Sequence, residues 1–344
     1  MNSPRIIVNA ANCHIGGGRT LLNGFLKGLK SYCGEVIVYV DARFIHNIAL
    51  SENVTFIKVN RFKRYKITLD IKKRIKPDDI ILYFGNLPPF SKIKSNNVYL
   101  MLSSRFYVDR ISFKGFKLKS ILTIGAEKLY FKMFIKNIDH LIVQTTSMKN
   151  LVLKTGFDRN IFIWPFHDLD ILNNSPIHSS SKKDVGSFIY VASLVPYKNH
   201  QRLLEAWKIL KNENLNPKLY LTVDSDNALS KWIISFVKEN KLNVSLLFNL
   251  SRNELLSYYE KSDVLIYPSL FEAYGLPLIE AKSYNLKVIA ADLDYCWDFI
   301  HPDGWFNPVD VNSISRAIKR YLMTSNNLDK VLTPTEFINN LTLK

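Results

Sequence analysis

The sequence has 344 residues, enough for two domains that each bury a core of their own. Apolar residues make up 47% and charged residues 22%, which excludes a largely disordered chain, and no run approaches the ~20 apolar residues that span a bilayer. The formal net charge is +16, and residues 1–170 contain 27 Lys and Arg against 12 Asp and Glu. This half therefore meets an anionic partner or surface, unless its lysines are simply solvated.

The first half of the chain alternates short β-rich runs with amphipathic stretches. We expect helices at residues 20–32 and 117–136, where apolar residues recur at helical spacing. We expect strands at residues 5–9, 35–40, 54–59, 79–84, 97–102, 140–144 and 161–164. This alternation is typical of an open parallel sheet.

The same alternation restarts after a polar interruption at residues 167–184, which has the composition of a linker. We expect strands at residues 187–192, 218–223, 244–248, 264–267 and 287–290, and helices at 201–212, 228–240, 252–261, 277–284 and 311–323. The sequence thus predicts an α/β protein with two Rossmann-like, doubly wound parallel-sheet domains that face each other across a cleft. Ligands of such sheets bind beyond the carboxyl ends of the strands, so the cleft is the expected site.

We place the first domain at residues 1–168, the linker at 169–185 and the second domain at 186–323. Residues 324–344 form a tail that either crosses back to the first domain or stays loose.

The most informative segment, residues 269–280, reads Ser-Leu-Phe-Glu-Ala-Tyr-Gly-Leu-Pro-Leu-Ile-Glu. It follows a strand, and Pro277 is expected at the first position of the next helix, where proline is favoured. The unpaired N–H groups of a helix start form an anion site, and Gly275 lets the backbone approach a ligand closely. A nucleotide diphosphate suits this site, with Glu280 one turn further along for the ribose hydroxyls and Glu272 facing the sugar. The alternative is a plain strand–loop–helix turn with two incidental acids.

A glycine-rich turn, Gly16-Gly17-Gly18, follows the first strand and opens a helix. It permits close approach of a phosphate or sugar, although its spacing is not that of the dinucleotide-binding fingerprint. A turn without a ligand remains the alternative. His14 precedes it and is a candidate acceptor-side residue, although a lone histidine is more often structural or solvated.

The 269–280 segment resembles the signature of the retaining GT-B glycosyltransferases, especially their large fourth family. Residues 191–199 (Val-Ala-Ser-Leu-Val-Pro-Tyr-Lys-Asn), 249–255, 259–265 and 306–310 are similar to further blocks of that family. The resemblance covers about residues 187–320, whereas the first half matches mainly in rhythm. It implies a UDP- or GDP-sugar donor and transfer with retention, without a metal or other cofactor. It also implies that the first domain lies on the acceptor side and that the second binds the nucleotide-sugar.

The resemblance also implies roles for single positions. Glu272 is similar to the acid that contacts the donor sugar, and Lys198 to the lysine that neutralises the diphosphate, so we expect both to be catalytic. Glu280 is similar to the ribose-binding acid. Ser193 stands where relatives commonly have an arginine, which leaves more charge to Lys198, with Arg202 as a stand-in. The expected donor contacts also include Tyr274, Gly275, Leu276, Ser193, Gly16, Gly17 and Gly18.

Residues 102–109, Leu-Ser-Ser-Arg-Phe-Tyr-Val-Asp, resemble the Asn-Arg-Phe motif of polysaccharide-assembly members of the family. Arg105 is expected to bind a phosphate or acceptor group, and Asp109 is a candidate base. Many relatives have a histidine in this region and this chain does not, so the sequence identifies no acceptor-side base.

Two further features bear on metals and membranes. The Asp-x-Asp triplets at residues 168–170, 224–226 and 292–294 raise the alternative of a metal site, but the two-domain resemblance accounts for their surroundings and we expect no metal. Residues 117–136 form a basic amphipathic stretch in which Lys128, Lys132 and Lys136 share one face. This helix either lies on an anionic membrane surface or buries its apolar side in the core.

Location follows from the cysteines and the N-terminus. Cys13, Cys33 and Cys296 are too few and too scattered for a disulfide framework, and no signal peptide is evident. We therefore expect a cytoplasmic protein, peripheral on the inner face of the cell membrane.

The sequence predicts a retaining, metal-independent glycosyltransferase that moves a sugar from a nucleotide-sugar to a hydroxyl of a lipid-linked glycan in bacterial surface polysaccharide or O-antigen synthesis. A non-catalytic sugar-nucleotide- or glycan-binding scaffold is the first alternative, and the presence of Lys198, Glu272 and Glu280 argues against it. A nucleic-acid-binding protein is the second, suggested by the pI of about 9.5. No recognition module supports it, so we expect no nucleic-acid partner.

Overall fold

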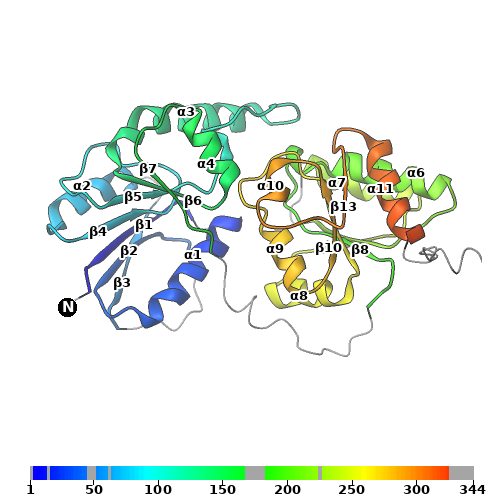
Figure 1. Ribbon diagram of the computed structural model, residues 1–344, viewed down its shortest axis with the longest axis horizontal. Coiled ribbons are helices and arrows are strands. Elements are labelled where there is room, and N and C mark those ends of the chain that lie inside the picture. Colours follow the sequence, from blue (N-terminus) through cyan, green and yellow to red (C-terminus); the bar gives the residue numbers. More distant parts are fainter. Residues whose placement is uncertain are drawn as a thin grey trace, which may run out of the picture.

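The computed structural model describes residues 3–13, 16–44, 52–60, 63–166, 183–223 and 227–324. These residues form two α/β domains, each built on one parallel sheet with helices on both sides (Figure 1). The predicted fold class of two doubly wound parallel-sheet domains is therefore confirmed.

The first sheet has seven parallel strands in the order β3-β2-β1-β4-β5-β6-β7. They are β1 (Ile6–Ala10), β2 (Val36–Asp41), β3 (Val54–Val59), β4 (Ile80–Tyr83), β5 (Val98–Met101), β6 (His140–Val143) and β7 (Asn160–Ile163). In the register, Ile7 of β1 pairs with Ile37 of β2 and with Ile81 of β4. Every residue of β2 is buried, because helices cover both faces of the sheet.

The helices of the first domain lie in two layers (Figure 1). Helix α1 (Gly16–Gly28) covers one face, where Leu22 packs into a core cluster with Val8. Helices α2 (Tyr65–Arg74), α3 (Leu118–Phe134) and α4 (Thr146–Leu153) cover the other face, where Ile67 and Phe131 share a cluster with Ile7. Val8 and Ile7 point to opposite faces because side chains alternate along a strand.

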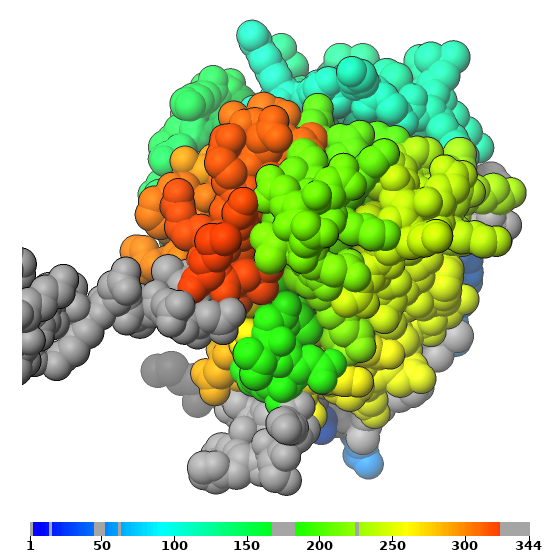
Figure 2. All heavy atoms as spheres, turned by 90° about the vertical axis from the view of Figure 1, so that its right-hand side faces the viewer, coloured from blue at the N-terminus to red at the C-terminus, as the bar shows by residue number. Residues whose placement is uncertain are grey.

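The second sheet has six parallel strands in the order β10-β9-β8-β11-β12-β13. They are β8 (Phe188–Tyr190), β9 (Leu219–Val223), β10 (Val244–Phe248), β11 (Val264–Tyr267), β12 (Lys287–Ala291) and β13 (Gly304–Phe306). The helices are α6 (His200–Asn212), α7 (Ala228–Glu239), α8 (Arg252–Lys261), α9 (Leu276–Ser283), α10 (Asp294–Trp297) and α11 (Val311–Thr324). On the outer surface of this domain, α11 lies beside α6 (Figure 2).

Most expected elements are present, and several have the expected ends. Strands 54–59, 244–248 and 264–267 and helix 252–261 agree residue for residue. Helix α1 begins at Gly16, four residues before the expected start at Thr20, so the three glycines form its first turn. Helices α2, α4 and α10 and strand β13 are not among the expected elements; α10 and β13 are very short and have little periodicity. The linker segment 167–182 and the tail 325–344 lie outside the described residues.

Helix α3 presents an apolar stripe to the outside. Leu118, Leu122, Leu129 and Met133 are 53–71% exposed, and at 100° per residue they lie within an arc of about 60°. Phe131 points into the core instead. The alternative that the apolar side of this helix is buried is therefore wrong for these four residues.

The expected lysine face of this helix is also wrong. Lys128 turns inward and donates to the backbone carbonyl of Asp109 at 2.5 Å, and Lys136 belongs to a 3-10 turn, Ile135–Asn137, beyond the helix. Among the three, Lys132 is the one exposed on α3. Within the described ranges, no helix is long and apolar enough to cross a membrane.

Candidate active site

The carboxyl ends of both sheets lie at the boundary between the two domains. Gly17, after β1, is so close to α9 that a Cβ there would lie 3.6 Å from Cδ1 of Leu276. Thr145, after β6, has its hydroxyl 3.5 Å from the carbonyl of Ala273, which follows β11. The 269–280 segment therefore lies where ligands of parallel sheets bind.

Two helices begin side by side at this boundary. Gly275 caps α9 with a φ of +74°, a left-handed conformation that favours glycine, and the helix starts at Leu276. Pro277 is the second helical residue rather than the first. Because Gly17 in the first turn of α1 lies against Leu276, the positive ends of two helix dipoles are adjacent. Such a pair of helix starts suits a bound anion.

The two residues expected to be catalytic, Lys198 and Glu272, form an ion pair. Glu272 lies on the loop between β11 and α9, and Lys198 ends a 3-10 turn, Pro196–Lys198. The hydroxyl of Tyr267 donates to the same carboxylate oxygen of Glu272 at 2.8 Å. Burial, reinforced by the Glu272 charge, raises the pKa of Tyr267 well above its usual value, so the phenol keeps its proton to donate. The side chains of the pair are only 13% and 12% exposed.

Asn199 fixes the backbone next to Lys198. It adopts a φ of +63°, and its Nδ2 donates to the carbonyl oxygens of Pro268 at 3.0 Å and Pro308 at 2.7 Å. Tyr190 donates to the carbonyl of Lys198 at 2.6 Å. This role of Asn199 was not predicted from the sequence, although asparagine is among the few non-glycine residues that readily adopt this conformation.

The two residues considered in place of the missing family arginine do not meet Lys198. Ser193 is exposed, and only its backbone carbonyl has a hydrogen bond here, from Val195 N–H at 3.0 Å. Arg202 donates to Oδ1 of Asn199 at 3.0 Å. Arg202 therefore supports the turn that holds Lys198.

His200 lies directly after this turn and is almost completely buried. Its ring lies 5.0 Å from that of Tyr190, and neither ring nitrogen has a hydrogen-bond partner among the described residues. Burial, together with the nearby Lys198 charge, lowers the pKa of His200 to about 3. The histidine is therefore neutral at physiological pH.

Glu280 is the fifth residue of α9 and is 4% exposed. Arg252 donates to Oε1 at 2.8 Å and Tyr259 donates to Oε2 at 2.9 Å. These two partners fix the direction of the carboxylate. Neither partner was predicted from the sequence. Both lie on α8, and the only local signal is the capping box of Ser251 and Glu254, which marks the start of that helix.

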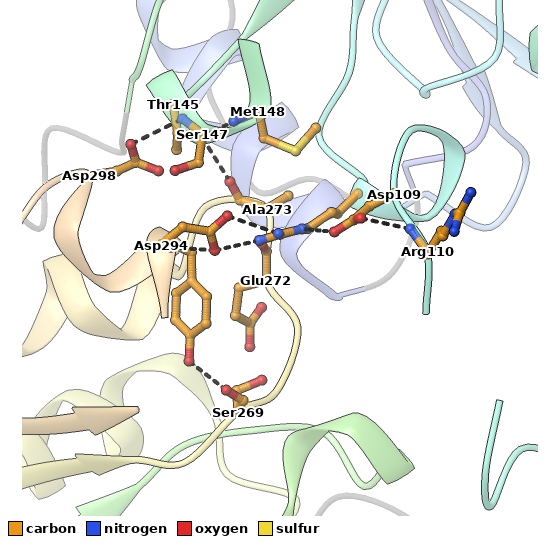
Figure 3. A network of polar contacts seen from close by, with 12 residues as sticks. Asp109, Arg110, Thr145, Ser147, Met148, Ser269, Glu272, Ala273, Asp294 and Asp298 are labelled. Atoms are coloured by element: carbon orange, nitrogen blue, oxygen red, sulfur yellow. Dashed lines mark hydrogen bonds and ion pairs between the residues drawn. The ribbon is translucent and has the colours of Figure 1, made fainter. Parts of the chain in front are cut away.

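Arg105 joins the two domains. It lies in a 3-10 turn, Arg105–Tyr107, after β5, and its Nε donates to Asp109 at 2.6 Å. Its two Nη atoms donate to both carboxylate oxygens of Asp294 in the second domain, at 2.7 and 2.8 Å, and Nη1 is 3.4 Å from the carbonyl of Glu272 (Figure 3). The other oxygen of Asp109 accepts from Arg110 N–H at 2.7 Å. Both predicted acceptor-side residues are thus engaged within the protein.

A second polar contact crosses the boundary beside this network. The N–H of Ser147, in the first turn of α4, donates to Oδ1 of Asp298 at 3.2 Å (Figure 3). Tyr274 donates to the carbonyl of Phe166 at 3.2 Å. The first domain thus holds the Glu272–Leu276 loop through side chains on both sides of it.

Aromatic rings cover the boundary next to Lys198. Phe116, from the loop before α3, stacks on Tyr197 with centroids 6.1 Å apart. Phe106 lies 5.0 Å from Phe271 and 5.6 Å from Tyr197. These rings limit access of water to one side of the Lys198–Glu272 pair.

The remaining candidates are His14 and the three Asp-x-Asp triplets. His14 and the triplets at 168–170 and 224–226 lie outside the described residues. In the third triplet, Asp292 accepts from the indole of Trp297 and Asp294 pairs with Arg105. In the part of the chain that the structure describes, no group of three His, Cys, Asp or Glu side chains is placed to hold a metal ion.

Comparisons with known proteins bear on this geometry. Residues 174–334 match the family model described as "Glycosyl transferases group 1". The chain is 28% identical over 202 residues to the O-antigen chain mannosyltransferase RfbU of Salmonella typhimurium, which covers 56% of this chain and 55% of that protein. It is 27% identical over 284 residues to the amylovoran biosynthesis glycosyltransferase AmsD of Erwinia amylovora, with coverages of 81% and 75%. The chain thus spans about half the length of RfbU and three quarters that of AmsD.

Solved structures share the whole fold. WaaG, described as a glycosyltransferase involved in lipopolysaccharide biosynthesis, superposes with a TM-score of 0.67 at 16% identity, covering 93% of this chain and 91% of that one. Sucrose-phosphate synthase from Thermosynechococcus elongatus gives 0.66 at 16% identity, with coverages of 93% and 90%. At these identities the likeness establishes the architecture, which is that of GT-B proteins.

Proposed function

We propose that this chain is a glycosyltransferase that uses a nucleotide-sugar donor, from the premise that its C-terminal domain belongs to the glycosyl transferases of group 1. The observation that supports this most is the Lys198–Glu272 pair beside two adjacent helix starts, at the carboxyl ends of both sheets. The names of RfbU and AmsD favour a role in bacterial surface polysaccharide synthesis. The acceptor in this proposal is a hydroxyl of a lipid-linked glycan.

In the proposed mechanism the leaving diphosphate of a UDP- or GDP-sugar lies at the starts of α1 and α9. Their N–H groups and Lys198 stabilise the negative charge that develops as the glycosidic bond breaks. Lys198 then exchanges part of its contact with Glu272 for the phosphate, which frees Glu272 to accept hydrogen bonds from the sugar. Glu280, oriented by Arg252 and Tyr259, receives the ribose hydroxyls.

Retention and metal independence belong to the same proposal. The acceptor hydroxyl attacks from the side of the leaving group, and an oxygen of the diphosphate takes its proton. No side chain is then required as a base, which agrees with the engagement of Asp109 by Arg105. Cationic stabilisation comes from Lys198 and the helix starts, so no metal is needed.

Release of nucleotide diphosphate from a panel of UDP- and GDP-sugars tests the proposal. Lys198→Ala should lower kcat about 100-fold or more, the usual effect of removing a donor that stabilises developing charge. Glu280→Gln should mainly raise the donor KM, about 10-fold, because it weakens charge-assisted hydrogen bonds. Lys238→Ala and Glu205→Gln, exposed on α7 and α6, are the matched controls.

Three outcomes contradict the proposal or its parts. Unchanged nucleotide release in both site variants would favour the non-catalytic scaffold. A product with inverted anomeric configuration, read by nuclear magnetic resonance, would exclude retention alone. Loss of activity in EDTA that is restored by a divalent cation would exclude metal independence.

We also propose that helix α3 rests on an anionic membrane surface. Its exposed stripe of Leu118, Leu122, Leu129 and Met133 is flanked by the exposed Lys119 and Lys132. The one acid of the helix, Glu127, points inward and accepts from Tyr107 at 3.1 Å. An apolar stripe bordered by cations is typical of helices that lie in the interface of anionic lipids.

Cosedimentation with phosphatidylglycerol vesicles tests the membrane contact. Leu122→Ser combined with Leu129→Ser should reduce vesicle binding about tenfold or more, because each leucine that the bilayer buries contributes at least about 1.5 kcal/mol to binding. Leu153→Ser, a half-exposed leucine at the end of α4, serves as control. Equal binding of the stripe variant and wild type would contradict this contact.

A further inference from the structure

A pocket of about 750 Å³ lies at the free edge of the first sheet, between β3 and α2. Its floor is apolar and includes Ile57 and Ile67. The lysines of its lining are Lys58, Lys63, Lys66 and Lys73, all exposed. This pocket is separate from the Lys198–Glu272 pair and from the α3 stripe.

The charge of this pocket is not neutralised within the described ranges. Among the residues that the structure describes, no carboxylate forms an ion pair with any of the four lysines. The one acid of the lining, Asp70, already accepts from Tyr39 at 2.7 Å and from Arg74 at 3.0 Å. Lys66 lies 5.8 Å from the ring centroid of its neighbour Tyr65. The pocket therefore offers exposed ammonium groups around an apolar floor, in the half of the chain that contains nearly all the excess positive charge.

From the lateral edge of the sheet, the pocket extends to the carboxyl-terminal edge, which faces the other domain. It is lined by residues at the carboxyl ends of β2 and β3, such as Ala42 and Asn60, and β1 ends at the same edge. Two strand spacings, about 10 Å, separate β1 from β3. Arg64, beside the pocket residue Lys63, donates to Oδ1 of Asn12 at 2.6 Å, in the connection between β1 and α1. The pocket wall is thus joined to the glycine turn at the domain boundary.

From these observations we propose that the pocket binds an amphiphile in which a phosphate or diphosphate is attached to an apolar chain. The lysines bind the phosphate. The apolar floor, with Tyr65 and Leu69 at its rim, receives the first part of the chain. The inference rests on the proposed function, in which the acceptor is a lipid-linked glycan. Helices α2 and α3 cover the same face of the first sheet.

Isothermal titration calorimetry with four probes tests the proposal without any donor. Farnesyl diphosphate supplies both parts of the ligand, inorganic diphosphate supplies the anion, farnesol supplies the chain, and phosphatidylglycerol vesicles supply a lipid surface. Wild-type protein should bind farnesyl diphosphate at least tenfold more tightly than inorganic diphosphate or farnesol.

The variants separate the two parts of the ligand. Lys63→Glu with Lys66→Glu should weaken farnesyl diphosphate binding about tenfold or more, since each lysine near an anionic group contributes about 1 kcal/mol. Tyr65→Ser with Leu69→Ser should bring the affinity for farnesyl diphosphate down to that for inorganic diphosphate. Lys94→Glu with Lys154→Glu, two exposed lysines of the same domain away from the pocket lining, should change neither.

Three results would overturn the inference. One is unchanged farnesyl diphosphate binding by the lysine variant. Another is equal affinity of the wild type for inorganic diphosphate, which would make the pocket a plain anion site. The third is a lysine variant that loses binding to vesicles but still binds farnesyl diphosphate, which would assign the lysines to lipid headgroups. Donor hydrolysis to water should persist in all pocket variants, so loss of this pocket and failure of the glycosyltransferase proposal give different results.

Discussion

Acidification from pH 8 to pH 5 should destabilise the second domain by about 2 kcal/mol through His200 alone. The pKa of this buried histidine is about 3, against about 6.5 in the unfolded chain. A group whose pKa is lowered by folding contributes its full stability above pH 6.5 and loses it as the pH falls toward 3. At pH 5 this histidine is protonated in the unfolded chain but neutral in the folded protein. This difference in protonation lowers the free energy of unfolding by ~2 kcal/mol.

Urea unfolding at pH 8 and pH 5, followed by the fluorescence of the buried Trp207, measures this effect. His200→Leu removes the titrating group with a side chain of similar size. Between pH 8 and pH 5, the free energy of unfolding of the variant should fall by about 2 kcal/mol less than that of the wild type. The other titrating groups are common to both proteins and cancel in the comparison. It should also be no less stable at pH 8, since both ring nitrogens lack partners. An identical pH dependence in the two proteins would refute the reasoning.

Three further predictions concern the domain boundary and the turns that form the site. Asp294→Asn removes the ion pair to Arg105 and should weaken the contact between the domains by about 1 kcal/mol. Small-angle X-ray scattering should then give a larger radius of gyration. Asp303→Asn, which removes ion pairs within one domain, should leave the radius of gyration unchanged. Gly275→Ala should lower the free energy of unfolding by about 1–2 kcal/mol because of its φ of +74°, whereas Gly125→Ala, with open space around it in α3, should raise it by about 1 kcal/mol. Asn199→Ala should lower the free energy of unfolding by about 3 kcal/mol, measured in a thermal melt, because it loses two hydrogen bonds and the preference for this backbone conformation. Asn199→Gly should lower it less, because glycine loses only the hydrogen bonds. Equal losses in the two variants would contradict the backbone contribution.

Elements with strong local patterns were predictable from the sequence. Strand 54–59 and helix 252–261 have the expected ends because alternation and capping residues are local properties. The start of α1 was misplaced, since three glycines have low helix propensity and the boundary contact of Gly17 is invisible in one dimension. The sequence left open whether the apolar side of α3 is buried, because periodicity identifies an apolar side but does not say whether another element covers it.

The sequence by itself determined the two parallel sheets and the position of the 269–280 segment between a strand and a helix start. Only the tertiary structure decided the partners of the side chains. Arg105 meets Asp294 across 189 residues, and Glu280 meets Arg252 and Tyr259 from another helix. The lysine-lined pocket likewise exists because β2, β3 and α2 come together at one sheet edge. Secondary structure follows from neighbours in the chain, whereas these contacts depend on how distant elements pack.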